Sequence, residues 1–330
     1  MKVYIMGIES TAHTFGCSIV TSNGEILSNV KSEYVPPSGG IHPREASQHH
    51  SQKALSVIKK ALEEAKISIY DIDGVAISLG PGLGPCLRTG ATIARAIALL
   101  INKPLIPVNH CVAHIEIGRL VTKEEDPLVV YVSGGNTIIS AFSDGRYRVF
   151  GETLDIALGN CLDVFARYLG LSHPGVPKLE ALADKGKNFI FLPYIVKGQD
   201  VSYSGLLTTA IKYIGKYDPC DLSMSLLETA YGMLAEVTER ALAHTEKTSL
   251  LLTGGVARSL RLQRILKSVC EEHSARFHVV PPELAGDNAA MIAWTGYLAY
   301  KENITIPIES SFIKQRWRLD EVEIPWRMKY

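Results

Sequence analysis

The first third of the chain alternates between short apolar runs and one long amphipathic stretch. Residues 3–8, 16–21 and 25–30 read as strands, and the Asn23-Gly24 dipeptide between the last two is typical of a tight hairpin turn. A loop rich in proline, glycine and serine comes next. Apolar residues then recur at helical spacing, at Ala54, Val57, Ile58, Ala61, Leu62 and Ala65. The pattern predicts a three-stranded meander and a helix, followed by a buried strand over 73–79 and a helix over 86–102.

The same order of elements recurs in the second half of the chain. Three further strands are expected over 127–133, 137–142 and 146–152, the last two joined by an Asp144-Gly145 turn. Later segments read as a strand turning into a helix, a strand, and a helix that begins at Asp287. We interpret this order as an internal duplication that gives two sheets flanked by helices, an α/β architecture.

This duplicated arrangement is similar to that of actin, sugar kinases and heat-shock chaperones. By analogy with them we expect a two-lobed, actin-like ATPase fold of the duplicated ribonuclease H-like kind. We expect an N-terminal lobe over 1–108, completed by the C-terminal tail 302–330. The second lobe is expected over 109–301 and would carry the candidate metal site. A fold of this kind supports many activities, so the function must be argued from the site.

Composition limits the classes of function. The 330 residues include 46% hydrophobic and 21% charged residues, which is typical of a compact globular protein. Thirty-four basic residues balance thirty-four acidic ones, so bulk charge predicts no nucleic-acid binding. We interpret the basic cluster over 314–318 as a solvated terminal segment. The six cysteines form no C-x-x-C pair, and no signal peptide or membrane-spanning run is visible; a cytoplasmic protein with no membrane partner is expected.

Three glycine-containing junctions follow predicted strands, over 7–12, 133–137 and 253–256. Glycine allows backbone N–H groups to approach a phosphate, although such turns also serve packing alone. Three junctions at equivalent strand ends favour a nucleotide-type cleft. The glycine-rich stretch over 79–85 lacks the ending of a P-loop and is interpreted as a rigid turn before the helix.

His110 and His114 are spaced to lie on one face of a helix, as a shared metal ion would require. An ordinary helix surface explains such a pair about as well. Glu116 lies beyond the second histidine, so the zinc-peptidase patterns are not met. Asp287 either caps the next helix or supplies an oxygen ligand. His42, His49 and His50 match no metal pattern and are left as candidate cleft-lining residues.

Nine motifs together closely resemble the tRNA N6-adenosine threonylcarbamoyltransferase family, the universal tRNA threonylcarbamoyladenosine synthases. The resemblance covers nearly the whole chain and is strongest to the archaeal and eukaryotic branch, the catalytic subunit of the KEOPS complex. The motifs are GIESTAHT, GGIHPREASQHH, SLGPGLGPCLRTG, VNHCVAHIE, YVSGGNT, ETLDIALGNCLDVFAR, LPYIVKGQDVSYSGLL, LLTGGVA and DNAAMIAWTG.

The resemblance implies transfer of a threonylcarbamoyl group from threonylcarbamoyl-AMP to N6 of the adenosine 3′ of the anticodon, in tRNAs reading codons that begin with A, with release of AMP. It implies one divalent metal ion, iron in the first place and zinc as the alternative, and an ATP- or AMP-type nucleotide in the cleft. The implied partners are tRNA and the other KEOPS subunits: a small dimerising subunit, a kinase-like ATPase and an accessory subunit.

The resemblance also assigns site residues. The metal ligands are His110, His114, Tyr131 and Asp287. The adenylate's phosphate and acyl part is assigned to Tyr131, Val132, Ser133, Gly134 and Gly135, and its nucleoside to Asp163, Gly175, Val176, Glu180 and Ser259. Glu9 is expected near the reacting carbonyl as the catalytic residue.

The sequence departs from the family pattern at Ser259, Val176 and Ile138, where an asparagine, a glycine and a polar residue are usual. We expect the nucleoside contacts at Ser259 and Val176 to be altered but not lost. Two alternatives stay open at this point: an ATP-dependent kinase or ATPase of the same fold, and a non-catalytic nucleotide-binding scaffold.

Overall fold

A computed structural model describes residues 2–36, 39–172 and 174–328. The chain forms two compact units, which are described separately here. Unit 1 comprises Met1–Val121, Ser143–Tyr147 and Asp287–Tyr330, and unit 2 comprises Thr122–Phe142 and Arg148–Gly286. Each unit therefore contains segments that are far apart in the sequence.

Unit 1 is built on a five-stranded sheet in the order β3-β2-β1-β4-β5. The first three strands form the expected antiparallel meander, whereas β1, β4 and β5 are parallel. Because parallel neighbours end at the same edge of a sheet, the residues that follow β1, β4 and β5 converge there. The strands are β1 (Tyr4–Glu9), β2 (Thr14–Thr21), β3 (Ile26–Glu33), β4 (Gly74–Gly80) and β5 (Leu105–Asn109).

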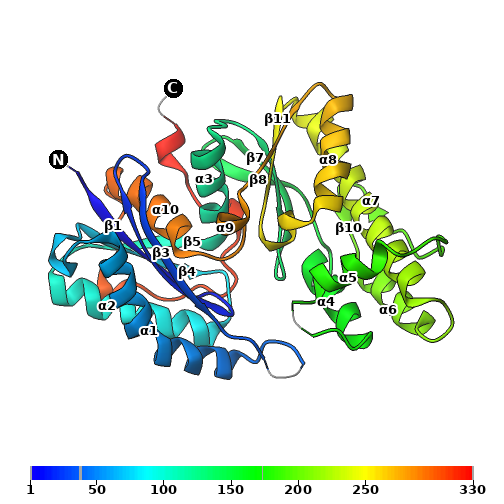
Figure 1. The fold of residues 1–330 in the computed structure, drawn as a ribbon. Helices are drawn as coiled ribbons and strands as arrows, with labels where there is room; N and C mark the ends of the chain where they lie inside the picture. Colours follow the sequence, from blue (N-terminus) through cyan, green and yellow to red (C-terminus); the bar gives the residue numbers. More distant parts are fainter. Residues whose placement is uncertain (1, 37–38, 173, 329–330) are drawn as a thin grey trace. The chain divides into compact units, whose positions relative to one another are not determined.

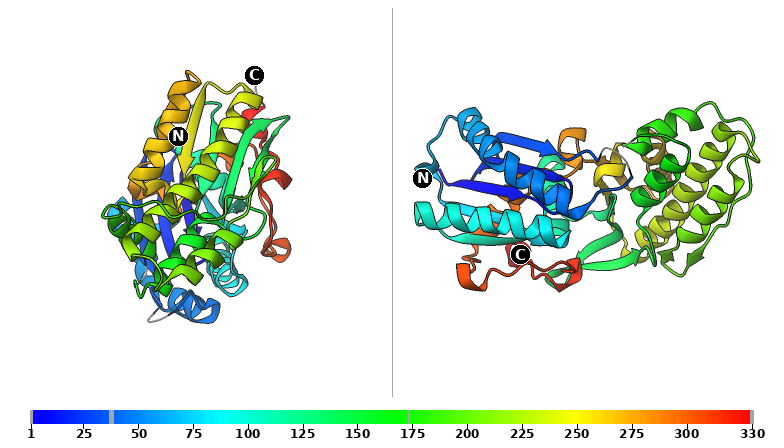
Figure 2. Two further views of the ribbon diagram at one scale, coloured as in Figure 1. Left: turned by 90° about the vertical axis from the view of Figure 1, so that its right-hand side faces the viewer. Right: turned by 90° about the horizontal axis from the view of Figure 1, so that it is seen from below.

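Helices cover both faces of this sheet (Figure 1). Helices α1 and α2 lie side by side on one face, and α10 packs against β1, β2 and β4 on the other (Figure 2). The helices are α1 (Pro43–Ala65), α2 (Gly84–Ile101), α3 (His110–Thr122) and α10 (Ala289–Lys301). Short 3-10 helices span Ile69–Asp71, Ile308–Ser310, Leu319–Glu321 and Pro325–Arg327.

Among the described residues, α2 alone is long and apolar enough to span a membrane. Half of this helix is buried within the protein. It packs on α1 and β4 with its apolar face in the core of unit 1. The helix therefore serves as a core helix of this unit.

The contact between α10 and β1 is unusually close. A Cβ atom at Gly7, in the middle of β1, would lie 2.4 Å from the backbone nitrogen of Ala293 in α10. Only glycine permits this approach, because any side chain would collide with helix backbone. The packing fixes where α10 begins, and therefore where Asp287 lies, relative to the end of β1.

The C-terminal tail belongs to unit 1, and the basic residues Lys314, Arg316 and Arg318 are exposed, as expected of a solvated cluster. The Asn109 side chain donates a hydrogen bond to the backbone oxygen of Trp317 at 3.1 Å, and the Lys314 amide donates to Leu79 at 2.7 Å. The Lys314 ammonium lies 4.6 Å from the centre of the Trp317 ring, a cation–π contact. The charge pattern therefore predicted the exposed side chains correctly, but it could not show that the backbone of this segment is hydrogen-bonded to β4 and β5.

Unit 2 repeats the same strand order, as β8-β7-β6-β11-β12. Strands β6 and β7 are antiparallel, whereas β6, β11 and β12 are parallel, which matches β1, β4 and β5. The strands are β6 (Leu128–Val132), β7 (Thr137–Ser143), β8 (Arg146–Glu152), β11 (Ser249–Thr253) and β12 (Arg276–Val279), with a small ribbon of β9 (Val196–Lys197) and β10 (Asp200–Val201). The expected duplication is confirmed.

In unit 2 the long helix α7 packs against α5, α6 and α8 (Figure 1). The core of this unit contains Phe165 of α4 and Leu234 of α7, both fully buried. The helices are α4 (Leu158–Tyr168), α5 (Gly175–Ala183), α6 (Ser204–Tyr213), α7 (Pro219–Thr245), α8 (Leu260–Glu272) and α9 (Pro282–Ala285), with a 3-10 helix over Gly255–Arg258.

The two units divide the chain differently from the expected boundary between 108 and 109. Helix α3 follows β5 directly, and α10 packs on the sheet of unit 1, so both belong to unit 1. His110, His114 and Asp287 consequently lie in unit 1, not in a C-terminal lobe. The sequence pattern predicted α10, whereas for α3 only the histidine spacing indicated a helix, and neither carried a signal of which sheet it would cover.

Candidate metal centre and substrate loops

His110 and His114 lie on the first turns of α3, immediately after β5. The Asn109 side chain accepts hydrogen bonds from the amides of Cys111 and Val112, at 2.9 and 3.1 Å, and so caps the start of this helix. The two imidazoles are one helical turn apart, with ring centres separated by 4.8 Å. Both histidines are buried, which rules out the ordinary helix surface that the spacing alone allowed.

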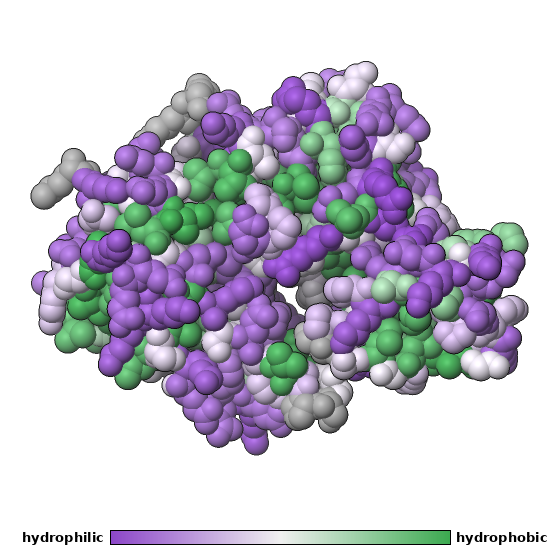
Figure 3. Space-filling model, in the orientation of Figure 1, coloured by the Kyte–Doolittle hydropathy of each residue, from purple (hydrophilic) through white to green (hydrophobic). Residues whose placement is uncertain are grey.

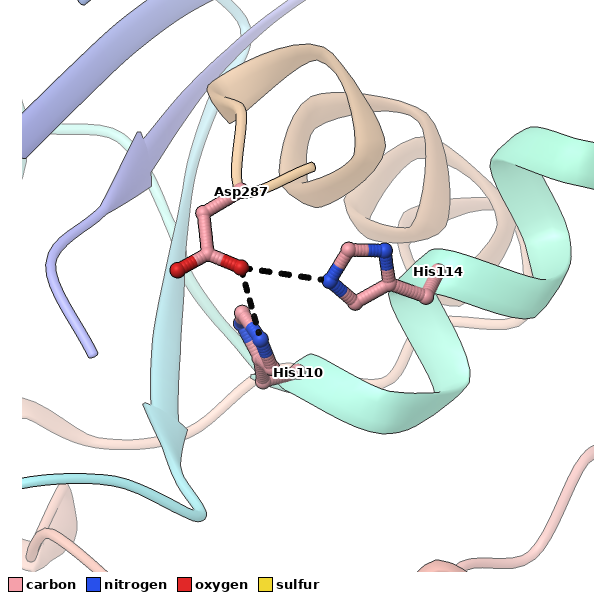
Figure 4. A group of neighbouring side chains, drawn as sticks. All are labelled: His110, His114 and Asp287. Carbon is pink, nitrogen blue, oxygen red and sulfur yellow. Dashed lines mark ion pairs between the residues drawn. The ribbon is translucent and has the colours of Figure 1, made fainter. Parts of the chain in front are cut away.

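Asp287 supplies the third member of the cluster (Figure 4). Its Oδ1 atom lies 3.5 Å from Nε2 of His110 and 3.4 Å from Nε2 of His114. Helix α10 begins at Ala289, two residues after the expected start, and Asn288 caps it by accepting a hydrogen bond from the Met291 amide at 3.1 Å. The cap is therefore Asn288, and the Asp287 carboxylate is directed at the histidines.

The cluster has the dimensions of a metal site. One ligand atom from each of His110, His114 and Asp287 lies within 4.8 Å of the others. Nitrogen and oxygen ligands about 2.0–2.2 Å from a zinc-like ion stand roughly 3.4 Å apart around a tetrahedron. The observed separations of 3.5 and 3.4 Å agree with that spacing. The donor set fits a divalent metal ion.

Glu9, at the end of β1, lies beside this cluster and is fully buried. Its Oε2 atom is 3.0 Å from Nδ1 of His110. Its Oε1 atom accepts hydrogen bonds from the amide and the hydroxyl of Thr11, both at 2.6 Å. The expected site residue Glu9 is therefore adjacent to the histidines, and Thr11 is a neighbour that the sequence patterns did not single out.

The charges of these groups are strongly coupled. Burial alone would lower the pKa of His110, but the carboxylates of Glu9 and Asp287 raise it to about 10. Burial lowers the pKa of His114. Burial would raise the pKa of Asp287, whereas hydrogen bonds from both histidines hold it well below its ordinary value. The pocket thus favours positive charge between its carboxylates.

In unit 2, the predicted phosphate-binding residues form a tight loop after β6. The Ser133 hydroxyl accepts hydrogen bonds from the amides of Gly135 and Asn136, at 3.3 and 3.0 Å. A Cβ atom at Gly134 or Gly135 would meet no atom within 4 Å. Tyr131 is buried in β6, and its hydroxyl accepts a hydrogen bond from the Asn136 side chain at 3.4 Å. Its assignment as a metal ligand stays a prediction.

The glycine junction after β11 lies against this loop. Gly254 has a φ of +97°, and a Cβ atom there would be 2.1 Å from the backbone oxygen of Val132. Only glycine fits both the conformation and the space. The helix expected after this junction is first a 3-10 turn over Gly255–Arg258, and α8 begins at Leu260.

The residues assigned to the nucleoside form two pairs within unit 2. The Asp163 carboxylate accepts a hydrogen bond from the Gly175 amide at 2.9 Å. Ser259 caps α8 by accepting from the Leu262 amide at 3.1 Å, and its hydroxyl donates to Glu180. Tyr231 also donates to Glu180, at 3.2 Å.

The departures from the family pattern also have places in unit 2. Val176 is partly buried against the core of the unit, and Ile138 pairs with Tyr131 across β6 and β7. Ser259 lies beside Glu180, one of the predicted nucleoside residues. Position 259 therefore offers a hydroxyl group, whereas the usual asparagine would offer a side-chain amide.

His49 and His50 lie on α1 and contact neighbouring elements of unit 1. His50 is fully buried, and its Nε2 atom lies 3.0 Å from the backbone oxygen of Ala12, in the loop after β1. His49 contacts Ser32 of β3 at 3.0 Å. His50 therefore packs against the loop after β1, and His49 packs against β3. The proximity of Glu9 and His110 could have been anticipated from the strand order, since both residues stand at the ends of parallel strands of one sheet.

Fold and site together define an α/β protein of the actin-like ATPase type with a buried histidine–aspartate cluster suited to a divalent metal. HypF from T. kodakarensis shares the fold, with a TM-score of 0.66 and 16% identity over 92% of this chain and 48% of that chain. The activator of 2-hydroxyisocaproyl-CoA dehydratase from Clostridium difficile shares it with a TM-score of 0.56 and 13% identity, covering 91% of this chain and 97% of that one.

The chain belongs to the family described as TsaD, tRNA N6-adenosine threonylcarbamoyltransferase, whose profile matches residues 25–294. Relatives of that name are 59% identical in Thermofilum pendens, over 98% of this chain and 97% of the relative, and 58% identical in Caldivirga maquilingensis, over 98% of both. The protein is thus an acyltransferase that modifies tRNA. This membership decides against the kinase and scaffold alternatives.

Proposed function

We propose that the chain transfers a threonylcarbamoyl group from threonylcarbamoyl-AMP to N6 of the adenosine 3′ of the anticodon, in tRNAs reading codons that begin with A, and releases AMP. A divalent metal ion bound by His110, His114 and Asp287, with Tyr131 as a further ligand, takes part. The observation that carries the proposal is the convergence of three ligand atoms within 4.8 Å, two from buried histidines and one from the partly buried Asp287.

Charge balance supports a divalent ion. Two carboxylates, Glu9 and Asp287, flank the histidine pair in a site where Glu9 is fully buried. Buried carboxylates are costly unless they are paired with positive charge. Two neutral imidazoles leave two negative charges, which one divalent cation neutralises. The mixed nitrogen and oxygen donors suit iron, our first assignment, and also zinc.

The reaction requires the enzyme to orient its two substrates more than to activate them. In a mixed anhydride the carbamoyl carbon already carries a good leaving group. The N6 amine attacks this carbon, a C–N bond forms, the bond to the phosphate oxygen breaks, and N6 loses a proton. When bound, the metal supplies Lewis-acid polarisation and holds the activated substrate. No covalent protein nucleophile is needed, and the reaction gains from positioned donors.

The loops of unit 2 are proposed to hold the adenylate. The loop over 133–135, with Tyr131 and Val132, receives the phosphate and acyl part, where the open space at Gly134 and Gly135 allows close approach. The nucleoside is assigned to two pairs, Asp163 with Gly175 and Glu180 with Ser259, and to the backbone at Val176. Carboxylates such as Glu180 accept hydrogen bonds from ribose hydroxyls, and the Ser259 hydroxyl extends that polar surface.

The proposed partners follow the family branch to which the motifs are most similar. We infer that the chain works in the cytoplasm with the other KEOPS subunits, namely a small dimerising subunit, a kinase-like ATPase and an accessory subunit. The target adenosine must be presented as an unstacked base, so recognition should depend on the anticodon loop.

The test is a double variant, His110→Ala with His114→Ala. Both side chains belong to one ligand set, so metal content and tRNA modification should both be lost while circular dichroism and thermal unfolding stay close to wild type. Metal analysis on purified protein and a product assay with synthesised adenylate measure the two effects.

His244→Ala is the matched control, because His244 is an exposed histidine on α7, in unit 2. This variant should keep both metal and activity. Stoichiometric metal in the double variant, or product formation at the wild-type rate, would contradict the proposal.

A further inference from the structure

The two ring nitrogens of His110 face different carboxylates. Nε2 points to Asp287, at 3.5 Å, where the proposed metal would lie. Nδ1 points away from it, to Oε2 of Glu9 at 3.0 Å. An imidazole that binds a metal through one nitrogen carries its proton on the other, and a hydrogen-bond acceptor there fixes this arrangement.

Both oxygens of Glu9 are already engaged. Oε1 receives two hydrogen bonds from Thr11, from its amide and its hydroxyl, each at 2.6 Å. Oε2 faces His110, and the residue has no exposed surface. A carboxylate used in this way has no free oxygen to direct at a substrate. Its geometry indicates a role that acts through His110.

We infer that Glu9 and Thr11 form a clamp that holds His110 in the Nδ1-protonated tautomer, with the Nε2 lone pair directed at the metal position. Glu9 is then a positioning residue and not the catalytic residue that the family resemblance suggested. The inference rests on the metal site of the proposed function.

Contacts with α1, α2 and the sheet fix the backbone that carries Glu9 and Thr11. The backbone oxygen of Thr11 accepts a hydrogen bond from the Leu83 amide at 2.7 Å, which ties it to the start of α2. His50 contacts the next residue, Ala12, at 3.0 Å. Glu9 itself ends β1, two strands from β5, which leads into His110. The loop therefore presents the carboxylate from a backbone fixed on three sides.

The sharpest variant is Glu9→Gln, which keeps the shape and changes the hydrogen-bond pattern. The Thr11 amide can only donate, so the glutamine oxygen must face it. The glutamine NH2 group then faces Nδ1 of His110 and donates to it. This forces the imidazole proton onto Nε2, the nitrogen needed for the metal. Second-shell changes of this kind lower metal affinity by about 10–100-fold.

Affinity is measured by chelator competition with the full-length chain loaded with Zn²⁺, and ligand geometry by the absorption spectrum of the Co²⁺-substituted protein. Glu9→Gln should bind Zn²⁺ about 10–100-fold more weakly than wild type and change the Co²⁺ spectrum. Glu116→Gln is the control. This buried carboxylate lies on the same helix but contacts Tyr147 and Arg119, each at 2.6 Å, so its replacement should leave affinity and spectrum unchanged.

Wild-type Zn²⁺ affinity in Glu9→Gln would overturn the clamp. An equal loss of Zn²⁺ affinity in Glu9→Gln and Glu116→Gln would also overturn it, because it would reflect a general effect of removing a buried charge. Should Glu9→Gln fail to fold, nitrogen-15 NMR of wild-type protein with labelled histidine gives the same decision. The His110 proton should reside on Nδ1 in the Zn²⁺-loaded protein; metal bound through Nδ1 overturns the inference. Failure of the proposed function is distinct, since wild type would then bind no stoichiometric metal.

Discussion

The sequence left two roles open for Asp287, the cap of the following helix or an oxygen ligand of a metal. In the structure these roles are divided between Asp287 and its neighbour Asn288. Asn288 caps α10, and the Asp287 carboxylate is directed at the histidines. We predict that Asp287→Asn lowers metal affinity at least about 10-fold, because the replacement loses the anionic oxygen that a divalent ion requires. Asn288→Ala should instead cost about 1 kcal/mol of unfolding free energy, the usual value of an N-cap, and retain the metal.

The two variants control for one another. Urea unfolding and metal analysis on both proteins separate the roles, since each variant should change mainly one quantity. Loss of metal in Asn288→Ala as large as that in Asp287→Asn would contradict the division and indicate that the turn as a whole positions the ligand.

At the scale of elements, the close packing of α10 on β1 determines where Asp287 lies. Gly7→Ala would place a Cβ atom 2.4 Å from the Ala293 nitrogen and 2.5 Å from the Ala289 oxygen. Helix and strand must separate to accept it, at a cost of about 1–3 kcal/mol. We predict a lower melting temperature together with weaker metal binding, because the shift moves the start of α10.

Gly232→Ala is a suitable control for this variant. Gly232 lies inside α7, and the nearest atom to an added Cβ there is 3.8 Å away, on the Tyr194 ring. Alanine favours the helix over glycine by about 1 kcal/mol, so this change should be neutral or stabilising. A Gly7→Ala protein with the wild-type melting temperature would show that the two elements are not tightly packed.

A carboxylate also joins elements in unit 2. Asp155, between β8 and α4, accepts hydrogen bonds from the Ile156 and Tyr203 amides at 2.7 and 2.9 Å and from the Ser202 hydroxyl at 2.6 Å. Burial would raise the pKa of Asp155, but the hydrogen bonds from the serine hydroxyls and these amides lower it well below its ordinary value. Ionised Asp155 therefore holds the loop before α4 to the start of α6.

This pKa shift predicts a pH-dependent stability. A group whose pKa is lower in the folded state stabilises the protein above its unfolded pKa of about 3.9, and this contribution is lost as pH falls towards the folded pKa. Wild type should exceed Asp155→Asn in unfolding free energy at about pH 6, and the difference should shrink by about pH 3. Urea titrations at both pH values test this; a constant difference would assign the effect to packing instead of ionisation.

Patterns within a segment predicted the elements well, and contacts between segments account for what they missed. Strand alternation and helical spacing identified both meanders, the turn at Asp144-Gly145 and the helix that follows Asp287. They could not show that α10 packs on β1, since that contact joins segments almost 300 residues apart in sequence. The role of Thr11 could not be predicted for the same reason, because it depends on Glu9 and His110 lying close together at one edge of the sheet.

At the scale of the whole molecule, the repeated strand order agrees with the duplication inferred from the sequence. Both sheets place three parallel strands beside an antiparallel pair, and in each sheet predicted site residues follow a parallel strand: His110 follows β5 and Ser133 follows β6. Sequence periodicity therefore predicted the repeated order of elements, whereas the division into units depended on long-range packing of α3 and α10. The fold provides equivalent edges, and the histidine–aspartate cluster that fits a divalent metal ion lies at one of them.

The balance of charge over the molecule leads to a last prediction. Thirty-four basic and thirty-four acidic residues leave no net charge, and the face shown in Figure 3 mixes hydrophilic residues with scattered apolar ones. Tight tRNA binding depends mostly on the release of counterions from phosphates by basic side chains. We therefore expect the isolated chain to bind tRNA weakly, with a shallow dependence on salt.

Partner subunits should supply the missing basic surface, so adding them should tighten binding and steepen the dependence of log K on log salt concentration. Filter binding of one tRNA across a salt series, with the chain alone and with the candidate KEOPS subunits, measures both quantities. A tRNA lacking its anticodon loop separates the two sources of affinity: it should keep the salt-dependent part and lose modification. Tight, steeply salt-dependent binding by the isolated chain would mean that a local basic surface suffices, and the requirement for partners would then have to lie in the chemistry.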